Sequence, residues 1–139
     1  MANITAAAVN ELRKRTGVGM MDCKKALVEC DGDMDKAIDY LREKGQKLAA
    51  KRADRDASEG AVLATVNADK TFAAVIMMNC ETDFVAKNED FVAFTREVLQ
   101  TAVDAKAKSL EEVMALTING LSVETMIVEQ VAKIGEKIT

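Results

Sequence analysis

Closely spaced carboxylates are the first candidates for catalytic residues in this 139-residue chain. Glu81 and Asp83 form one close pair, and Glu89 and Asp90 form another. General acid–base work needs an activated partner beside such a pair, and the sequence offers no second cluster. Histidine is absent, which excludes imidazole bases, histidine triads and histidine metal sites. We therefore interpret the acids as solvated groups near a helix start.

Thiols and glycines predict no reactive site either. Cys23, Cys30 and Cys80 are odd in number and form no CxxC pair, so neither a disulfide framework nor a zinc site fits. Three buried thiols in a reducing cytosol are expected instead. Gly17 and Gly19 do not follow a strand and lack the Lys-Ser/Thr of a phosphate loop. We expect no catalytic residue, no metal and no cofactor.

Composition favours a mainly helical protein. Proline is absent and aromatic residues make up only 4% of the chain. The formal net charge of −4 argues against a general nucleic-acid binder. No apolar run approaches the ~18 residues of a membrane span, and the N-terminus lacks the pattern of a secretory signal. A cytoplasmic location, with no membrane and no DNA as partner, is the expectation.

The charge distribution divides the chain in two. Residues 1–56 hold twelve Lys/Arg against ten Asp/Glu, a net of +2, whereas residues 57–139 hold seven against thirteen, a net of −6. The change falls in the polar stretch AAKRADRDASEG. We therefore predict domains at 1–56 and 57–139.

Three short helices are predicted in the first domain, over residues 6–15, 20–30 and 34–44. Thr5 and Asp33 cap the first and third helices, and Gly17 and Gly45 end them. A helical tail through residues 48–55 stays open. Each helix has an apolar stripe that needs a partner face, which predicts a compact three-helix bundle. The stripes are Val9 and Leu12; Met20, Cys23, Leu27 and Cys30; and Met34, Ala37, Ile38 and Leu41.

The second domain is predicted to begin with an antiparallel β-hairpin. Residues 61–67 alternate loosely, and the run TFAAVIMMNC is continuously apolar and should be the more buried strand. Helices follow over 88–106, over 109–116 with Ser109 and Glu112 as a capping box, and over 122–135 after a break at Asn119-Gly120. Because two strands are not a stable sheet alone, helices cover them or a third strand is missing. The fold class is α+β, mainly helical.

Two places are unusual for a chain that only folds. Met20 and Met21 are adjacent on a helix, so one of them should be exposed. Phe84 lies in a short polar turn between a strand and a helix. Its ring either tucks onto the sheet or projects as an apolar wedge able to enter another protein's surface.

Three stretches of the chain resemble bacterial translation elongation factor Ts. They are TAAAVNELRKRTGVGMMDCKKALVECDGDMDKAIDYLREKG, then CETDFVAKNEDF, then VAKIGEKI, in the family's order. The resemblance implies a ubiquitin-associated-like N-terminal domain and a guanine-nucleotide exchange factor for the GTPase elongation factor Tu. The partner would be GDP-bound or nucleotide-free, and no direct nucleotide binding is expected.

The same resemblance implies the contact residues. Arg13, Met20 and Met21 would lie on the surface that contacts the GTPase domain. Thr82, Asp83, Phe84 and Val85 would form an intruding turn that wedges between partner helices and loosens the bound Mg²⁺. Ile134 and Gly135 would match a further contact near the phosphate side of the nucleotide.

The resemblance also bears on chain length and leaves two alternatives. Family members continue well past the VAKIGEKI motif, so we expect an N-terminal fragment of a longer protein. The first alternative is a helical protein-interaction module without exchange activity. The second is a weak RNA-binding fragment that acts through residues 42–55 and shows a steep salt dependence.

Overall fold

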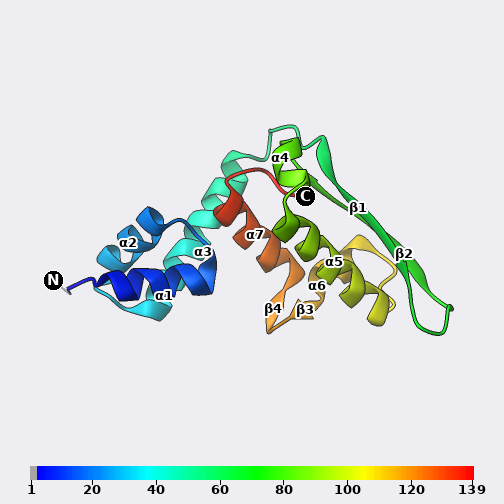
Figure 1. The fold of residues 1–139 in the computed structure, drawn as a ribbon, viewed down its shortest axis with the longest axis horizontal. Coiled ribbons are helices and arrows are strands. Elements are labelled where there is room, and N and C mark those ends of the chain that lie inside the picture. The colour runs from blue at the N-terminus through cyan, green and yellow to red at the C-terminus, as the bar shows by residue number, and fades with distance from the viewer. Residues whose placement is uncertain (1–2) are drawn as a thin grey trace. The chain divides into compact units, whose positions relative to one another are not determined.

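The computed structural model describes residues 3–139 and divides the chain into two compact units. The first unit comprises the chain through Asp54 together with Val128–Glu136. The second comprises Arg55–Ile127 together with Lys137–Thr139. Figure 1 labels the elements of both. The predicted fold class, mainly helical α+β, is confirmed: three N-terminal helices precede an antiparallel hairpin packed against helices.

Three helices form the core of the first unit: α1 (Ala6–Thr16), α2 (Met20–Glu29) and α3 (Met34–Lys51). The Thr5 hydroxyl accepts a hydrogen bond from the Ala8 backbone N–H at 3.2 Å, and the Asp33 carboxylate accepts one from Lys36 at 3.0 Å. Gly17 ends α1 in the left-handed conformation, at φ 70°. The buried core comprises Val9, Leu12, Val18, Cys23, Ala26, Leu27, Ala37 and Leu41.

Helix α3 does not end at Gly45, contrary to the sequence-based prediction. It continues to Lys51, so the helical tail left open by the sequence exists in part. Gly45 is buried where α3 meets the end of α7 (Val123–Ile134). A Cβ at Gly45 would lie 3.0 Å from the Ala132 Cβ and 3.3 Å from the Val128 carbonyl oxygen. The glycine therefore serves close helix packing and not a helix stop.

The second unit is built on the predicted antiparallel hairpin. Strand β1 (Glu59–Val66) pairs with β2 (Ala73–Cys80), with Glu59 opposite Cys80 and Val66 opposite Ala73. The Asn67 side-chain oxygen closes the loop by accepting the Thr71 and Phe72 backbone N–H groups at 2.9 and 3.0 Å.

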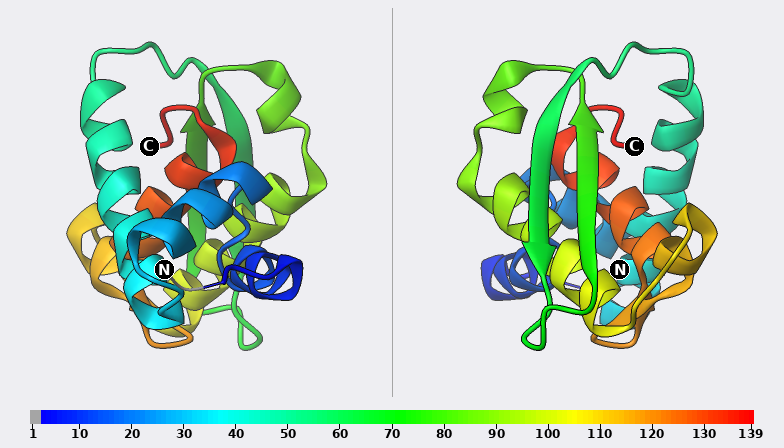
Figure 2. Two further views of the ribbon diagram at one scale, coloured as in Figure 1. Left: turned by 90° about the vertical axis from the view of Figure 1, so that its left-hand side faces the viewer. Right: turned by 90° about the vertical axis from the view of Figure 1, so that its right-hand side faces the viewer.

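Among residues 3–139, helices cover only one face of the hairpin. Helix α5 (Glu89–Asp104) packs against both strands and lies behind them in the right-hand view of Figure 2. Strand β2 buries Met78 and Cys80, whereas β1 buries Ala61, so the second strand is indeed the more buried. Its continuous apolar run still alternates in burial, because successive side chains point to opposite faces. The exposed face carries Val62, Val66, Val75 and Met77.

The segment after α5 contains a small hairpin that the sequence analysis missed. Helix α6 (Leu110–Ala115) leads to β3 (Thr117–Ile118) and β4 (Leu121–Ser122), which are joined by Asn119 and Gly120 at φ 52° and 82°. The predicted capping box is half present. The Ser109 hydroxyl accepts the Glu112 N–H at 3.2 Å, but the Glu112 carboxylate accepts the Lys108 N–H and not that of Ser109.

A third backbone segment pairs with the free edge of β2. The Asn79 N–H donates to the Thr139 carbonyl at 2.7 Å, and the Thr139 N–H donates back to the Asn79 carbonyl at 3.2 Å. The hairpin is thus supported both by a covering helix and by this edge contact. Within residues 3–139, none of the helices has the length and apolar character needed to cross a bilayer.

Candidate partner-binding site

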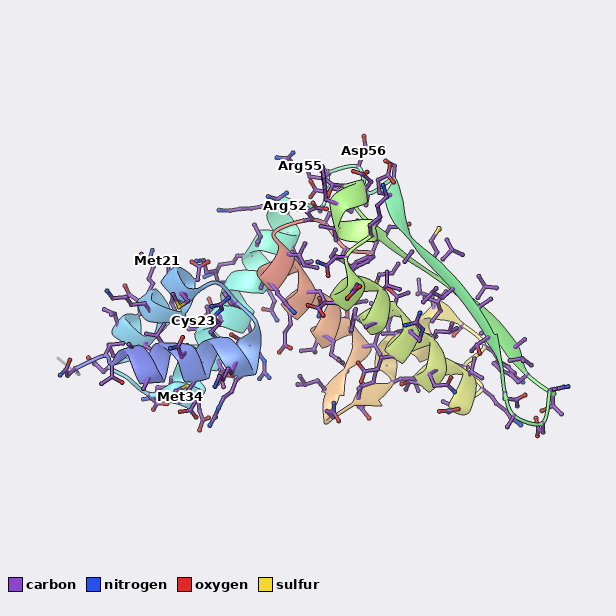
Figure 3. All side chains as sticks on the ribbon, viewed as in Figure 1. Met21, Cys23, Met34, Arg52, Arg55 and Asp56 are labelled. Carbon is purple, nitrogen blue, oxygen red and sulfur yellow. The ribbon has the colours of Figure 1, made fainter. Side chains whose placement is uncertain are left out.

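Both methionines at the start of α2 are exposed. Met20 is 51% exposed and Met21 78%, whereas the sequence analysis placed Met20 on the core face and expected one exposed residue. Met20 is the first residue of the helix, so it lies at the end of the stripe whose centre, Cys23 and Leu27, fills the core. Figure 3 places Met21 on the outer edge of α2. The pair therefore forms an exposed apolar surface at the start of α2.

Arg13 is an exposed residue of α1, and its positive charge acts on the Cys23 thiol of α2. Burial is the main cause that raises the pKa of the Cys23 thiol, and the carboxylate of Asp22 adds to it. The Thr16 hydroxyl and the positive charge of Arg13 act in the opposite direction.

Phe84 belongs to a short helix and not to the polar turn expected from the sequence. Helix α4 (Asp83–Ala86) begins after Thr82, whose hydroxyl accepts the Val85 N–H at 3.4 Å. Asp83 lies in the first turn and pairs with Lys87 at 3.1 Å. Phe84 is 83% exposed, so its ring does not tuck onto the sheet.

The two remaining predicted site residues lie at the C-terminal end of α7. Ile134 is its last residue, and Gly135 follows in the left-handed conformation at φ 81°, with its N–H bonded to the Val131 carbonyl at 2.8 Å. Both residues are half-buried. They belong to the first unit, as do Arg13, Met20 and Met21, whereas residues 82–85 belong to the second.

Metal-ligand clusters and reactive thiols are two further kinds of site to consider among the described residues. Within residues 3–139, no group of three or more Cys, Asp or Glu side chains is placed to hold a metal ion. Cys23 and Cys80 are buried and Cys30 is half-buried, so the expectation of three buried thiols holds for two. Burial raises the pKa of the Cys23 and Cys30 thiols, which keeps them protonated and poorly nucleophilic at neutral pH.

Sequence comparisons identify the family. The family described as "Elongation factor Ts, mitochondrial, N-terminal" matches residues 1–49, and "Elongation factor TS" matches residues 81–139. The chain belongs to the elongation factor Ts family. Elongation factor Ts of Christiangramia forsetii is 58% identical over 138 residues, and that of Rhodopirellula baltica is 55% identical over 138 residues. Each match covers 99% of this chain, with 50% and 42% of the respective relative.

The chain therefore spans about half the length of the curated elongation factor Ts relatives that it matches. Elongation factor Ts of Flavobacterium johnsoniae, 56% identical, shows the same relation, with 42% of its length covered.

Sequence reasoning missed the helical character of residues 83–86. A signal was present, because a threonine followed by an aspartate is a typical start of a helix. It also missed the hydrogen bonds that join Asn79 and Glu81, just before this helix, to residues 137–139, because partners so distant in sequence leave no local signal.

Proposed function

We propose that this chain promotes GDP release from elongation factor Tu. Family membership supports the choice of partner, and the exposed ring of Phe84 on a capped helical turn is the observation that carries the mechanism. The proposal includes a cytoplasmic location and both the GDP-bound and the nucleotide-free partner. It needs no catalytic residue and no cofactor of the chain's own.

The mechanism rests on differential binding. A wedge that fits only a distorted conformation of the GTPase stabilises that conformation and so lowers its affinity for the nucleotide. By linkage, the bound nucleotide weakens binding of the wedge by the same factor. Burying a phenylalanine side chain contributes about 1.5–3 kcal/mol. This is part of the ~5.5 kcal/mol that a 10⁴-fold effect requires, so further contacts must anchor the complex.

We assign that anchoring to the exposed residues of the first unit. Arg13, Met20 and Met21 supply one contact surface, and Ile134 and Gly135 supply another at the end of α7. In this proposal Thr82, Asp83 and Val85 present Phe84 and help to loosen the partner's Mg²⁺. Residues 1–56 act as an N-terminal ubiquitin-associated-like domain and residues 57–139 as part of a core domain.

Release of a fluorescent GDP from elongation factor Tu tests the proposal. Phe84→Ala should slow release by roughly 10- to 100-fold, because the apolar burial of the ring is lost. Leu110→Ala is the matched control, since Leu110 is also a large exposed side chain, at 73%. Equal release by wild type and Phe84→Ala would contradict the wedge, and binding without release would favour an interaction module.

A further inference from the structure

We propose that Glu81 is a positioning residue for Phe84. Glu81 lies between Cys80, the last residue of β2, and Thr82, the cap of α4. Its carboxylate oxygen Oε1 accepts the backbone N–H of Lys137 at 2.7 Å, across 56 positions of sequence, in a partly buried environment. The hydrogen bond therefore ties the start of α4 to the C-terminal segment 137–139, within the second unit.

Further contacts hold the same segment beside the hairpin. The Asn79 and Thr139 backbones exchange two hydrogen bonds, and the Lys137 ammonium donates to the Arg55 carbonyl at 3.0 Å. Segment 137–139 is thus itself fixed, and it can serve Glu81 as a rigid anchor. A bond to a mobile tail would not orient the helix that follows.

The cap of α4 is also held from the side of the strand. The Cys80 thiol donates to the Thr82 carbonyl at 3.2 Å, and the same carbonyl accepts the Ala86 N–H at 3.2 Å. Cys80 is fully buried, so the hydrogen bond fixes Thr82 relative to the core of the unit.

Helix α4 needs such external support. It has four residues, none of them buried, and a helix of one turn is not stable on its own. Phe84 is 83% exposed, so packing does little to hold its ring in one direction. The direction must come from the residues that anchor the helix. Pre-ordering the ring lowers the entropy lost on binding, which is how Glu81 would assist insertion.

The test uses Trp as a reporter, because the chain contains none. In a Phe84→Trp background, the fluorescence anisotropy of the indole measures local mobility of α4 without any partner. Glu81→Ala should increase that mobility, and Glu81→Asp should do the same, because the shorter side chain withdraws the oxygen from the Lys137 N–H. Glu81→Gln should not, since its amide oxygen reaches the same donor.

Glu111→Ala is the matched control, an exposed glutamate of α6 in the same unit. Circular dichroism and Tm identify any variant that unfolds globally, and the Asp and Gln variants keep the test decisive if the Ala variant does so. Equal anisotropy in Glu81→Asp and Glu111→Ala would overturn the proposal. So would increased mobility in Glu81→Gln with none in Glu81→Asp, because that pattern would assign the effect to charge.

The consequence for exchange rests on the proposed function and is measured separately. On the native Phe84 background, Glu81→Asp should reduce the maximal rate of GDP release about tenfold, the value of one such hydrogen bond, and Glu81→Gln should restore it. Wild-type chain that releases no GDP would refute the proposed function, and the anisotropy would still test Glu81. The link to exchange would be overturned if Glu81→Asp increased indole mobility in the Phe84→Trp background but left GDP release undiminished on the native Phe84 background.

Discussion

Phe84 and Met21 have the highest exposed fractions among the exposed large hydrophobic side chains of the described residues, 83% and 78%. Single exposed apolar residues are ordinary on protein surfaces. Each lies in the first turn of a helix, Met21 in α2 and Phe84 in α4.

At the scale of single residues, we predict that Met21 contributes to partner binding but not to the stability of the fold. Met21→Ser should weaken binding to nucleotide-free elongation factor Tu by roughly tenfold, because an apolar contact is lost. Its Tm should stay within about 1–2 °C of wild type, since surface substitutions change stability by about 0.5 kcal/mol or less. Calorimetric titration and thermal unfolding measure the two quantities.

Leu110→Ser is the control for Met21→Ser, since it removes a similarly exposed side chain, 73% against 78%, outside the proposed contact residues. We expect it to leave both affinity and Tm unchanged. A large fall in Tm for Met21→Ser would show that Met21 supports the bundle, and the binding result would then carry no weight.

At the scale of elements, the helix starts follow local chemistry. Thr5, Asp33, Asn88 and Ser109 each accept a backbone N–H from the first turn of the helix that they precede. Helix ends are less local, as Gly45 shows. The same residue type ends α1 at Gly17 and is passed by α3 at Gly45.

Gly45 gives an element-scale prediction on stability. Gly45→Leu should lower the free energy of unfolding by about 1–3 kcal/mol, because the new side chain must force α3 away from Ala132 and Val128. Gln46→Leu introduces the same residue at the next, exposed position and should be close to neutral. Urea unfolding followed by circular dichroism measures both variants. A stabilised Gly45→Leu variant would mean that helix propensity outweighs the close approach.

At the scale of the whole molecule, the proposed contact residues are divided between two compact units. Met21 belongs to the first unit and Phe84 to the second. The charge is also divided, with a net of +2 over residues 1–56 and −6 over residues 57–139. A partner that engages both units would gain from two separate sets of contacts.

This division predicts additive effects on affinity. Met21→Ser and Phe84→Ala combined should weaken binding to nucleotide-free elongation factor Tu by the product of the single effects, within about twofold, as expected for independent sites. Met20→Ser with Met21→Ser, two neighbours on one helix, should deviate from the product. Dissociation constants for the three single and two double variants provide the measurement, and strong coupling between Met21 and Phe84 would contradict independent contacts.

Local chemistry determined most of the secondary structure of this chain. The hairpin, α1, α2, the start of α3 and α5 were predictable because caps, turn residues and apolar periodicity act over three or four positions. The same information indicated Met20, Met21 and Phe84 as unusual, and the family resemblance supplied the proposed roles of Arg13 and residues 82–85.

Only the tertiary structure decided how those residues are presented. Gly45 is passed by α3 because α7, more than eighty positions later, packs against it. The segment before Phe84 is held by hydrogen bonds of Glu81 and Asn79 to Lys137 and Thr139, 56 and 60 positions away. Such contacts join segments that are remote in sequence, and they form only once the fold brings those segments together. The local pattern around each residue therefore carries no trace of them.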